Sequence, residues 1–254
     1  MPATVTNHPY PAPFIEINSI DSTNNYAVQQ LQKGQAIHGT AYFAYEQTAG
    51  KGQRGRQWHT QPGENIALSV VLNTKWLQGP RQFGLSMSVA MAAYDLFLKY
   101  AVNDTFIKWP NDLYWRDRKA AGILIENIVH GKEWQWAVAG IGMNINQTVF
   151  NSSIMNPVSL KQITGKNYDP VLLAKELCIN IQDRFNQLHN NGSATLLTEY
   201  NNVLYKKNEK IRLKKDNAVF DGLMERVNAD GQLVILAGGL EQVFNVGGVE
   251  WLIR

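Results

Sequence analysis

The chain has 254 residues, 44% of them hydrophobic and 18% charged, with a formal net charge of +3. This composition is ordinary for a globular protein, and the charge is too small to demand a nucleic-acid partner. The single cysteine, Cys178, excludes an intrachain disulfide and favours a reducing compartment. No apolar run reaches the about 20 residues of a membrane span, and residues 1–13 lack the pattern of a secretory signal. We therefore expect a soluble, cytoplasmic protein that binds neither membrane nor nucleic acid.

Apolar side chains that recur at spacings of three and four predict four helices. These are expected at residues 22–33, 80–100, from Asp169 and Pro170 onward, and 194–205. Strands are predicted where apolar and polar residues alternate, or where the run is largely uncharged. The clearest are "AYFAYEQ" at 41–47, "IALSVVL" at 66–72 and "EWQWAVAGIGMNIN" at 133–146. Between the first two, residues 48–65 have no apolar periodicity and are expected to form a long loop.

The two ends of the chain differ in composition from its middle. Proline and polar residues predict a flexible arm over residues 1–14. After "KKNEK" at 206–210, short alternating strands are separated by "NADG", "AGG" and "VGG", which favours a small barrel or sheet. We therefore divide the chain into the arm, a main domain over 15–206 and a small C-terminal β-barrel domain over 207–254.

The glycine-rich loop holds three cationic side chains, Lys51, Arg54 and Arg56, followed by Trp58. Its "GKGQRG" formally fits a dinucleotide fingerprint, but the polar residues that follow do not form the apolar-faced helix which that fold requires. A solvated surface loop is the simpler alternative. Glycines expose backbone N–H groups and cations attract phosphate or carboxylate, so we favour anion binding.

The segment "IKWPNDLYWRDRKAAGILIEN" at 107–127 can be a hairpin that turns at Asn111 and Asp112, or one wall of an anion site. On a strand that starts at Lys119, residues 119, 121, 123, 125 and 127 would share a face. Lys119 would then reach into a cleft, and Gly122 would leave room for a ligand. Asp112 could hold Mg²⁺ through water.

A second strand carries glycines on one face. Alternation in "WQWAVAGIGMNI" places Val138, Gly140, Gly142 and Asn144 together. The two glycines leave a strip wide enough for a flat ring, and Asn144 can both donate to and accept from an adenine edge. A β-bulge is the alternative explanation of the glycines.

Taken together, four motifs resemble those of the biotin protein ligases. They are "DSTN" at 21–24, "QTAGKGQRGRQW" at 47–58, "KWPNDLYWRDRKAAGILIE" at 108–126 and "GIGMNIN" at 140–146. The resemblance implies an α+β fold, with a mixed sheet flanked by helices in a class II synthetase-like catalytic domain. It also implies an ATP- and Mg²⁺-dependent ligase, which activates biotin as biotinyl-5'-AMP and transfers it to a lysine of a biotin carboxyl carrier protein. Homodimers are common in the family, and the resemblance leaves a homodimer and a monomer open.

The resemblance also assigns the site residues. Biotin binding is implied for Ser22, Thr23, Asn24, Gln47, Gly50, Lys51, Gly52, Gln53, Lys119 and Gly122. Nucleotide binding is implied for Arg54, Arg56, Trp58, Asn111, Lys119 and Asn144. Catalytic roles are implied for Lys119, Lys51 and Arg54, and Asp112 is the candidate Mg²⁺ ligand.

The sequence departs from the family pattern at two points. The family's loop commonly reads Gly-Arg-Gly-Arg, whereas Lys51 and Gln53 stand in place of the arginines here. This puts tight retention of the adenylate in doubt, and we hypothesise that Arg54 compensates. The second departure is that the residues ahead of position 15 are too few for a helix-turn-helix, so we expect a ligase without a DNA-binding role.

Three other interpretations remain open. A lipoate ligase performs the same chemistry on an acid whose ring lacks strong hydrogen-bonding groups, which fits Ser22, Thr23 and Gln47 less well. A non-catalytic biotin or nucleotide sensor would be expected to lose the lysine at position 119, which is present. An RNA-binding protein would be expected to interleave more aromatics with its basic residues.

Overall fold

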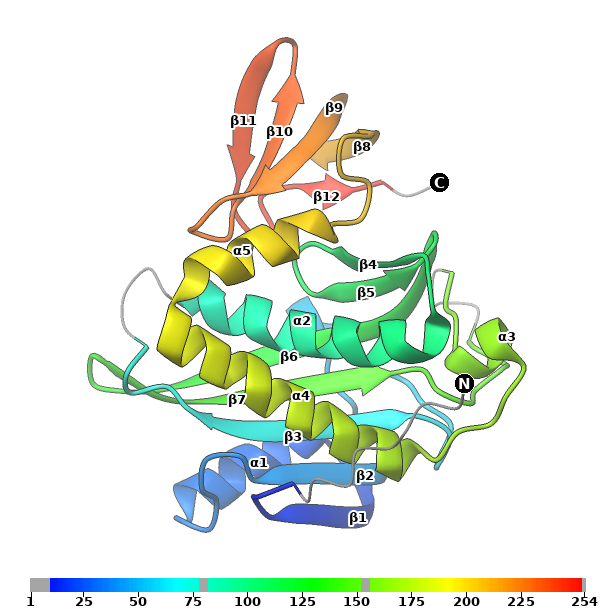
Figure 1. Ribbon diagram of the computed structural model, residues 1–254, viewed down its shortest axis with the longest axis vertical. Helices are drawn as coiled ribbons and strands as arrows, with labels where there is room; N and C mark the ends of the chain where they lie inside the picture. The colour runs from blue at the N-terminus through cyan, green and yellow to red at the C-terminus, as the bar shows by residue number, and fades with distance from the viewer. Residues whose placement is uncertain (1–9, 78–81, 152–155, 253–254) are drawn as a thin grey trace.

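The computed structural model describes residues 10–77, 82–151 and 156–252. Within them, a seven-stranded sheet with helices on both faces lies beside a smaller five-stranded sheet at the C-terminal end (Figure 1). None of the described helices is long and apolar enough to cross a membrane. The predicted α+β class is confirmed.

The larger sheet is mixed, as predicted. Its strands run in the order β1-β2-β3-β7-β6-β5-β4, with β1 and β2 parallel and each other neighbouring pair antiparallel. The strands are β1 (Phe14–Ile20), β2 (Ala41–Gln47), β3 (Ile66–Asn73), β4 (Thr105–Lys108), β5 (Asp112–Trp115), β6 (Arg118–His130) and β7 (Glu133–Met143). Strand β1 was not predicted, because Ile15 and Ile17 are its sole alternating pair before the polar Ser19.

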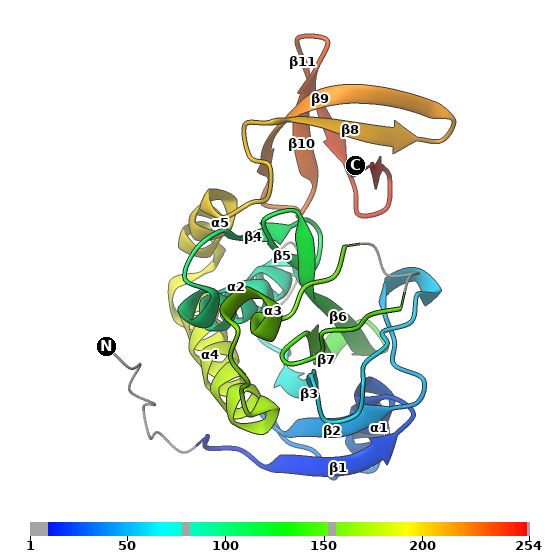
Figure 2. The ribbon, with the colours of Figure 1, turned by 90° about the vertical axis from the view of Figure 1, so that its right-hand side faces the viewer.

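Helices cover the two faces of this sheet unequally (Figures 1 and 2). The described helices are α1 (Thr23–Gln32), α2 (Gln82–Ala101), α3 (Leu160–Thr164), α4 (Pro170–Asn191) and α5 (Ser193–Asn202). The long helices α2 and α4 pack against one face of the sheet, and the main hydrophobic core lies there. On the opposite face, α1 contacts β2, β3 and β7 over a small apolar cluster that includes Ala27, Val71 and Val138. Because α1 has ten residues, it covers one end of that face and leaves the surface of β5, β6 and β7 to a cleft.

The predicted helix that begins at Asp169 is confirmed. The Asp169 carboxylate accepts hydrogen bonds from the backbone N–H groups of Val171 at 2.8 Å and Leu172 at 3.2 Å, which caps α4. The expected stripe along α4 is buried throughout: Leu173, Leu177, Ile181, Phe185 and Leu188. Cys178 is buried beside it, as a small apolar side chain would be.

One helix end differs from the predicted one, and one helix start is not tested. Helix α5 ends at Asn202 rather than 205. The segment after it instead runs beside β4, where Ile107 donates to the Val203 carbonyl and Tyr205 donates to the Ile107 carbonyl, each at 2.9 Å. Helix α2 begins at Gln82, and the predicted start near residue 80 lies outside the described residues.

The C-terminal sheet is open, so the predicted β-barrel is wrong. Its order is β11-β10-β9-β8-β12, and over residues 208–252 its two end strands are not paired with each other. The strands are β8 (Lys210–Lys215), β9 (Ala218–Val227), β10 (Leu233–Ala237), β11 (Leu240–Phe244) and β12 (Glu250–Trp251). Strand β12 has two residues, too few to bridge the gap to β11. Alternation in sequence predicts strands but does not predict whether the outer two meet.

At the other end of the chain, residues 1–9 of the expected arm lie outside the described residues. Tyr10 donates a hydrogen bond from its hydroxyl to the Gly39 carbonyl, and β1 begins at Phe14. The proposed domain boundary at 206 and 207 falls in the connection between α5 and β8.

Candidate active site

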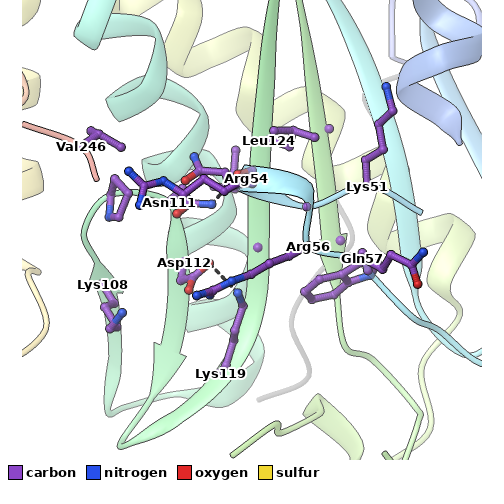
Figure 3. A pocket seen from close by; sticks show the side chains of 18 of the residues that line it. Lys51, Arg54, Arg56, Gln57, Lys108, Asn111, Asp112, Lys119, Leu124 and Val246 are labelled. Atoms are coloured by element: carbon purple, nitrogen blue, oxygen red, sulfur yellow. Dashed lines mark hydrogen bonds and ion pairs between the residues drawn. The ribbon is translucent and has the colours of Figure 1, made fainter. Parts of the chain in front are cut away.

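A cleft of about 1100 Å³ lies on the open face of the large sheet. Its floor is formed by β5, β6 and β7, and its walls by the start of α1, the glycine-rich loop and residues 246–251 of the C-terminal sheet (Figure 3). Every site residue assigned from the resemblance lines this cleft except Gly50, which packs behind Gln47. Residues that lie up to about 120 positions apart in sequence therefore meet in one place.

A row of directly opposed residues crosses the floor of the cleft. Lys108 on β4 faces Asp112 on β5, Asp112 faces Gly122 on β6, and Gly122 faces Gly142 on β7. Opposed residues in antiparallel strands place their side chains on the same face. Charged groups thus occupy one half of the row, and the other half has no side chain.

Lys119 joins this row through a β-bulge. The register of β5 and β6 shifts between Leu113 and Tyr114, which leaves one extra residue in β6 just after Lys119. The predicted shared face of 119, 121, 123, 125 and 127 is therefore wrong. A Cβ atom on Gly122 would lie 3.5 Å from the Lys119 Nζ atom, so Lys119 points to the face of Gly122. Bulges re-aim side chains in this way, and regular alternation could not predict it.

The re-aimed lysine forms an ion pair at the centre of the cleft. Its Nζ atom lies 2.7 Å from Asp112 Oδ1, and both side chains are largely buried. Figure 3 shows Arg56 pointing into the same space from the opposite wall. Asp112 thus holds the Lys119 ammonium in place, and the ammonium still faces the cleft.

The two glycines of β7 do admit close neighbours, as predicted, but these belong to the protein. A Cβ atom on Gly140 would meet the Asn24 amide, and one on Gly142 would meet the indole of Trp58. The flat ring over the strip is therefore Trp58 itself. Its buried indole N–H has no hydrogen-bond partner in the described part of the chain, an arrangement that is costly unless a ligand or a movement of the ring satisfies it.

A buried polar network forms the end of the cleft beneath α1. Gln47 Oε1 accepts from the Thr23 backbone N–H at 2.9 Å and from its hydroxyl at 3.1 Å. The Ser69 hydroxyl donates to Asn24 Oδ1 at 2.6 Å, and the Asn24 amide donates to Glu126 Oε2 at 2.7 Å. Neither Ser69 nor Glu126 was predicted. The available signal for Ser69 was a lone hydroxyl within the apolar "IALSVVL" strand.

The glycine-rich loop contains regular, hydrogen-bonded structure that the sequence does not indicate. Gly52 donates to the Arg56 carbonyl at 2.7 Å and Trp58 donates to the Gly50 carbonyl at 2.9 Å, which makes a small hairpin. Its tip is a short 3₁₀ turn at Gln53–Gly55 in which Arg54 has a left-handed backbone, with φ 57°. The Arg54 guanidinium lies over Gly247 in the turn between β11 and β12, and it fills the space that a side chain at position 247 would need.

Two predicted nucleotide contacts also have structural tasks. Asn111 donates from its side chain to the Ile123 carbonyl at 2.7 Å, which fixes the turn between β4 and β5 against β6. Asn144 donates to the Val158 carbonyl at 3.1 Å at the end of β7. Both residues line the cleft, and each retains its side-chain oxygen as an acceptor.

The charge of the cleft suits a polyphosphate. Among the described residues, six cations line it against three carboxylates: the cations are Lys51, Arg54, Arg56, Lys108, Lys119 and Lys214, and the carboxylates are Asp112, Asp216 and Glu250. The charge of Lys51 is partly neutralised, because its Nζ atom lies 3.4 Å from a carboxylate oxygen of Glu126. The remaining excess of positive charge is concentrated around Asp112, where an anionic ligand would be stabilised.

Asp112 is the acidic residue best placed to share a metal with such an anion. Among the described residues, no group of three or more His, Cys, Asp or Glu side chains could hold a metal by itself. Mg²⁺ commonly takes one or two carboxylates and completes its shell with phosphate oxygens and water. The residues present therefore fit Mg²⁺ that arrives with a nucleotide.

Comparison with known proteins agrees with this arrangement. Residues 16–144, about half of the chain, match the Biotin/lipoate A/B protein ligase family. The bifunctional ligase/repressor BirA of Escherichia coli is 30% identical over 87% of this chain and 68% of its own length. The biotin--[acetyl-CoA-carboxylase] ligase of Paracoccus denitrificans is 30% identical over 88% of this chain and 94% of its own length.

The fold has close structural relatives. Biotin protein ligase from Aquifex aeolicus, solved in complex with biotin and ATP, superposes with a TM-score of 0.80 at 22% identity, covering 95% of this chain and 99% of that one. The fold of this chain is therefore that of a biotin protein ligase structure. The chain belongs to the biotin/lipoate protein ligase family.

Proposed function

We propose that this protein is an ATP-dependent biotin protein ligase. The observation that carries the proposal is the Lys119–Asp112 pair, set in a cationic cleft that ends in the polar network beneath α1. A carboxylate oxygen of biotin attacks the α-phosphorus of ATP. The bond from that phosphorus to the bridging oxygen breaks, and pyrophosphate leaves with the electron pair. An acceptor lysine amine then attacks the acyl carbon and releases AMP, and the amine loses a proton.

The two ends of the cleft divide this work. Thr23 and Gln47, with Ser22 and Asn24, supply the hydroxyl and amide groups that a ureido ring would bind. Lys119 holds its charge where negative charge grows on the carboxyl and α-phosphate oxygens, so it stabilises the transition state more than the ground state. The hairpin at 50–58 covers the adenylate and keeps water from it.

Mg²⁺ is part of the proposal and would be held by Asp112 together with phosphate oxygens of ATP. When bound, the ion would neutralise part of the triphosphate charge. The acceptor is proposed to be a biotin carboxyl carrier domain, supported by the relative from Paracoccus, which is named as a ligase for acetyl-CoA-carboxylase.

The test is pyrophosphate release from ATP and Mg²⁺ with either biotin or lipoate. We expect release with biotin and at least about 100-fold less with lipoate, because a dithiolane ring leaves the polar groups at Thr23 and Gln47 unpaired. Comparable pyrophosphate release with lipoate would show that the protein is a lipoate ligase. Biotin binding without any release would support the sensor interpretation.

Retention of the adenylate is a second expectation. Because Gln53 lacks the charge of the family's usual arginine, we propose that Arg54, braced against Gly247, keeps the hairpin closed. Arg54→Ala is expected to raise biotinylation of bystander lysines about tenfold, since a mixed anhydride in solvent reacts with any amine. The readout is biotin incorporated into an unrelated protein, with Arg116→Ala, which removes an exposed arginine at the β5–β6 turn, as the matched control. Unchanged leakage in Arg54→Ala would contradict the compensation hypothesis.

A further inference from the structure

Lys108 is a half-buried cation in the cleft to which neither the resemblance nor the family match assigned a task. It ends β4 and faces Asp112 across the β4–β5 pair. Within the described part of the chain, no carboxylate lies within 4 Å of its Nζ atom, whereas Lys119 is paired with Asp112 at 2.7 Å. A half-buried ammonium without an ion-pair partner is costly, so its position requires another explanation.

Two aromatic rings contact this ammonium, and a third ring packs against both of them. Its Nζ atom lies 5.3 Å from the ring of Trp251 and 5.5 Å from that of Tyr114. Tyr205 packs against both rings, with centroid distances of 5.8 Å and 5.1 Å. Aromatic faces stabilise a cation without neutralising it. The cage therefore keeps the charge of Lys108 available to a ligand, and one of its walls comes from the C-terminal sheet.

The electrostatic surroundings agree with the geometry. Burial lowers the pKa of Lys108 below its usual value of 10.5, the attraction of Asp112 opposes that shift, and repulsion from Lys119 and Arg56 adds to it. The three cations thus act on the same small volume. An anion that enters it would relieve their mutual repulsion and compensate the lost hydration.

The order of groups along the floor indicates which anion this is. Trp58 covers Gly142 on β7, and Lys119 lies over Gly122 on β6. Asp112 follows on β5 and Lys108 on β4. Lys108 is thus two strands beyond Gly122, a distance of about 10 Å. A nucleotide with its base near Trp58 and its α-phosphate at Lys119 would extend its terminal phosphates over Asp112 toward Lys108.

We propose that Lys108, held by Tyr114 and by Trp251 of the C-terminal sheet, binds the β- and γ-phosphates of ATP and stabilises the departing pyrophosphate. This inference rests on the proposed adenylation. The C-terminal sheet would then contribute to the active site, because Trp251 holds the lysine that binds the departing pyrophosphate.

The test is ATP–pyrophosphate exchange by the full chain with biotin and Mg²⁺, using labelled inorganic pyrophosphate. Lys108→Met keeps the length of the side chain and removes its charge. We expect the KM for pyrophosphate to rise about tenfold or more, while the biotin Kd from calorimetry stays within about twofold. Lys108→Arg should restore most of the affinity, and Lys132→Met, at the exposed β6–β7 turn, should match the unmodified chain.

Trp251→Leu is expected to raise the same KM by a smaller factor, and it carries the test if Lys108→Met does not fold. An unchanged KM for pyrophosphate in both variants would overturn the inference. A change confined to the KM of the carrier protein would also overturn it, because Lys108 would then face the acceptor. Failure of the proposed function looks different, since the unmodified chain would then show no biotin-dependent exchange at all.

Discussion

Lys119→Ala is expected to lower the kcat/KM of biotin adenylation about 10³-fold, the largest effect anticipated for any single substitution in this chain. The bulge in β6 aims its ammonium at the face of Gly122, and Asp112 holds it there at 2.7 Å. The charge is therefore in place before the reaction and needs no reorganisation during it. Pyrophosphate release under single-turnover conditions measures the chemical step directly.

Two companion variants separate charge from packing. Lys119→Arg retains the charge but not the shape of the ammonium, so an intermediate loss is expected, with most of the effect in kcat. Lys132→Ala removes an exposed lysine from the β6–β7 turn and should have no effect. If Lys119→Ala weakened biotin binding but released pyrophosphate at the normal rate once saturated, Lys119 would be a binding residue and its proposed catalytic role would be wrong.

Asn24→Ala is expected to raise the KM for biotin about 100-fold and to lower the free energy of unfolding by about 2–4 kcal/mol. Asn24 is 4% exposed, and its amide joins Ser69 on β3 to Glu126 on β6 beneath the start of α1. Truncation removes one acceptor from the buried Ser69 hydroxyl and one donor from the Glu126 carboxylate, so that Thr23 and Lys51 are the partners that remain. It also loosens Thr23, whose backbone N–H and hydroxyl orient Gln47.

The neighbouring Asn25 provides the matched control. Its amide donates a hydrogen bond to the exposed Asp21 carboxylate just ahead of α1, so Asn25→Ala should leave the KM for biotin unchanged. Calorimetric titration with biotin and thermal unfolding report the two effects separately. If Asn24→Ala were less stable but bound biotin normally, the network would support the fold without shaping the biotin end of the cleft.

Both predictions depend on how the uncovered part of the sheet is used. Helix α1 is short, and the two glycines of β7 have no side chains, so Asn24 and Trp58 can lie directly on the strand. The C-terminal sheet then closes the cleft from the far side with residues 246–251. The site is therefore assembled between two sheets, and its Lys108 end depends on a residue near the end of the chain.

Much of the local structure is encoded in short-range patterns. The apolar stripe of α4 and its Asp169 cap follow from spacing and from the chemistry of a helix N-terminus. The motifs around Gln47, Asp112, Lys119 and Asn144 were sufficient to indicate a biotin protein ligase, because residue type and order persist when the contacts are not visible.

The tertiary structure decided everything that depends on pairing between distant segments. A one-residue bulge between β5 and β6 turned Lys119 to the face of Gly122, against the regular alternation. Whether the C-terminal strands close depends on β11 and β12 meeting, and they do not. The partnership of Lys108 with Trp251 joins positions 143 residues apart, and no local pattern records such a contact, because packing of the folded chain alone brings the two side chains together.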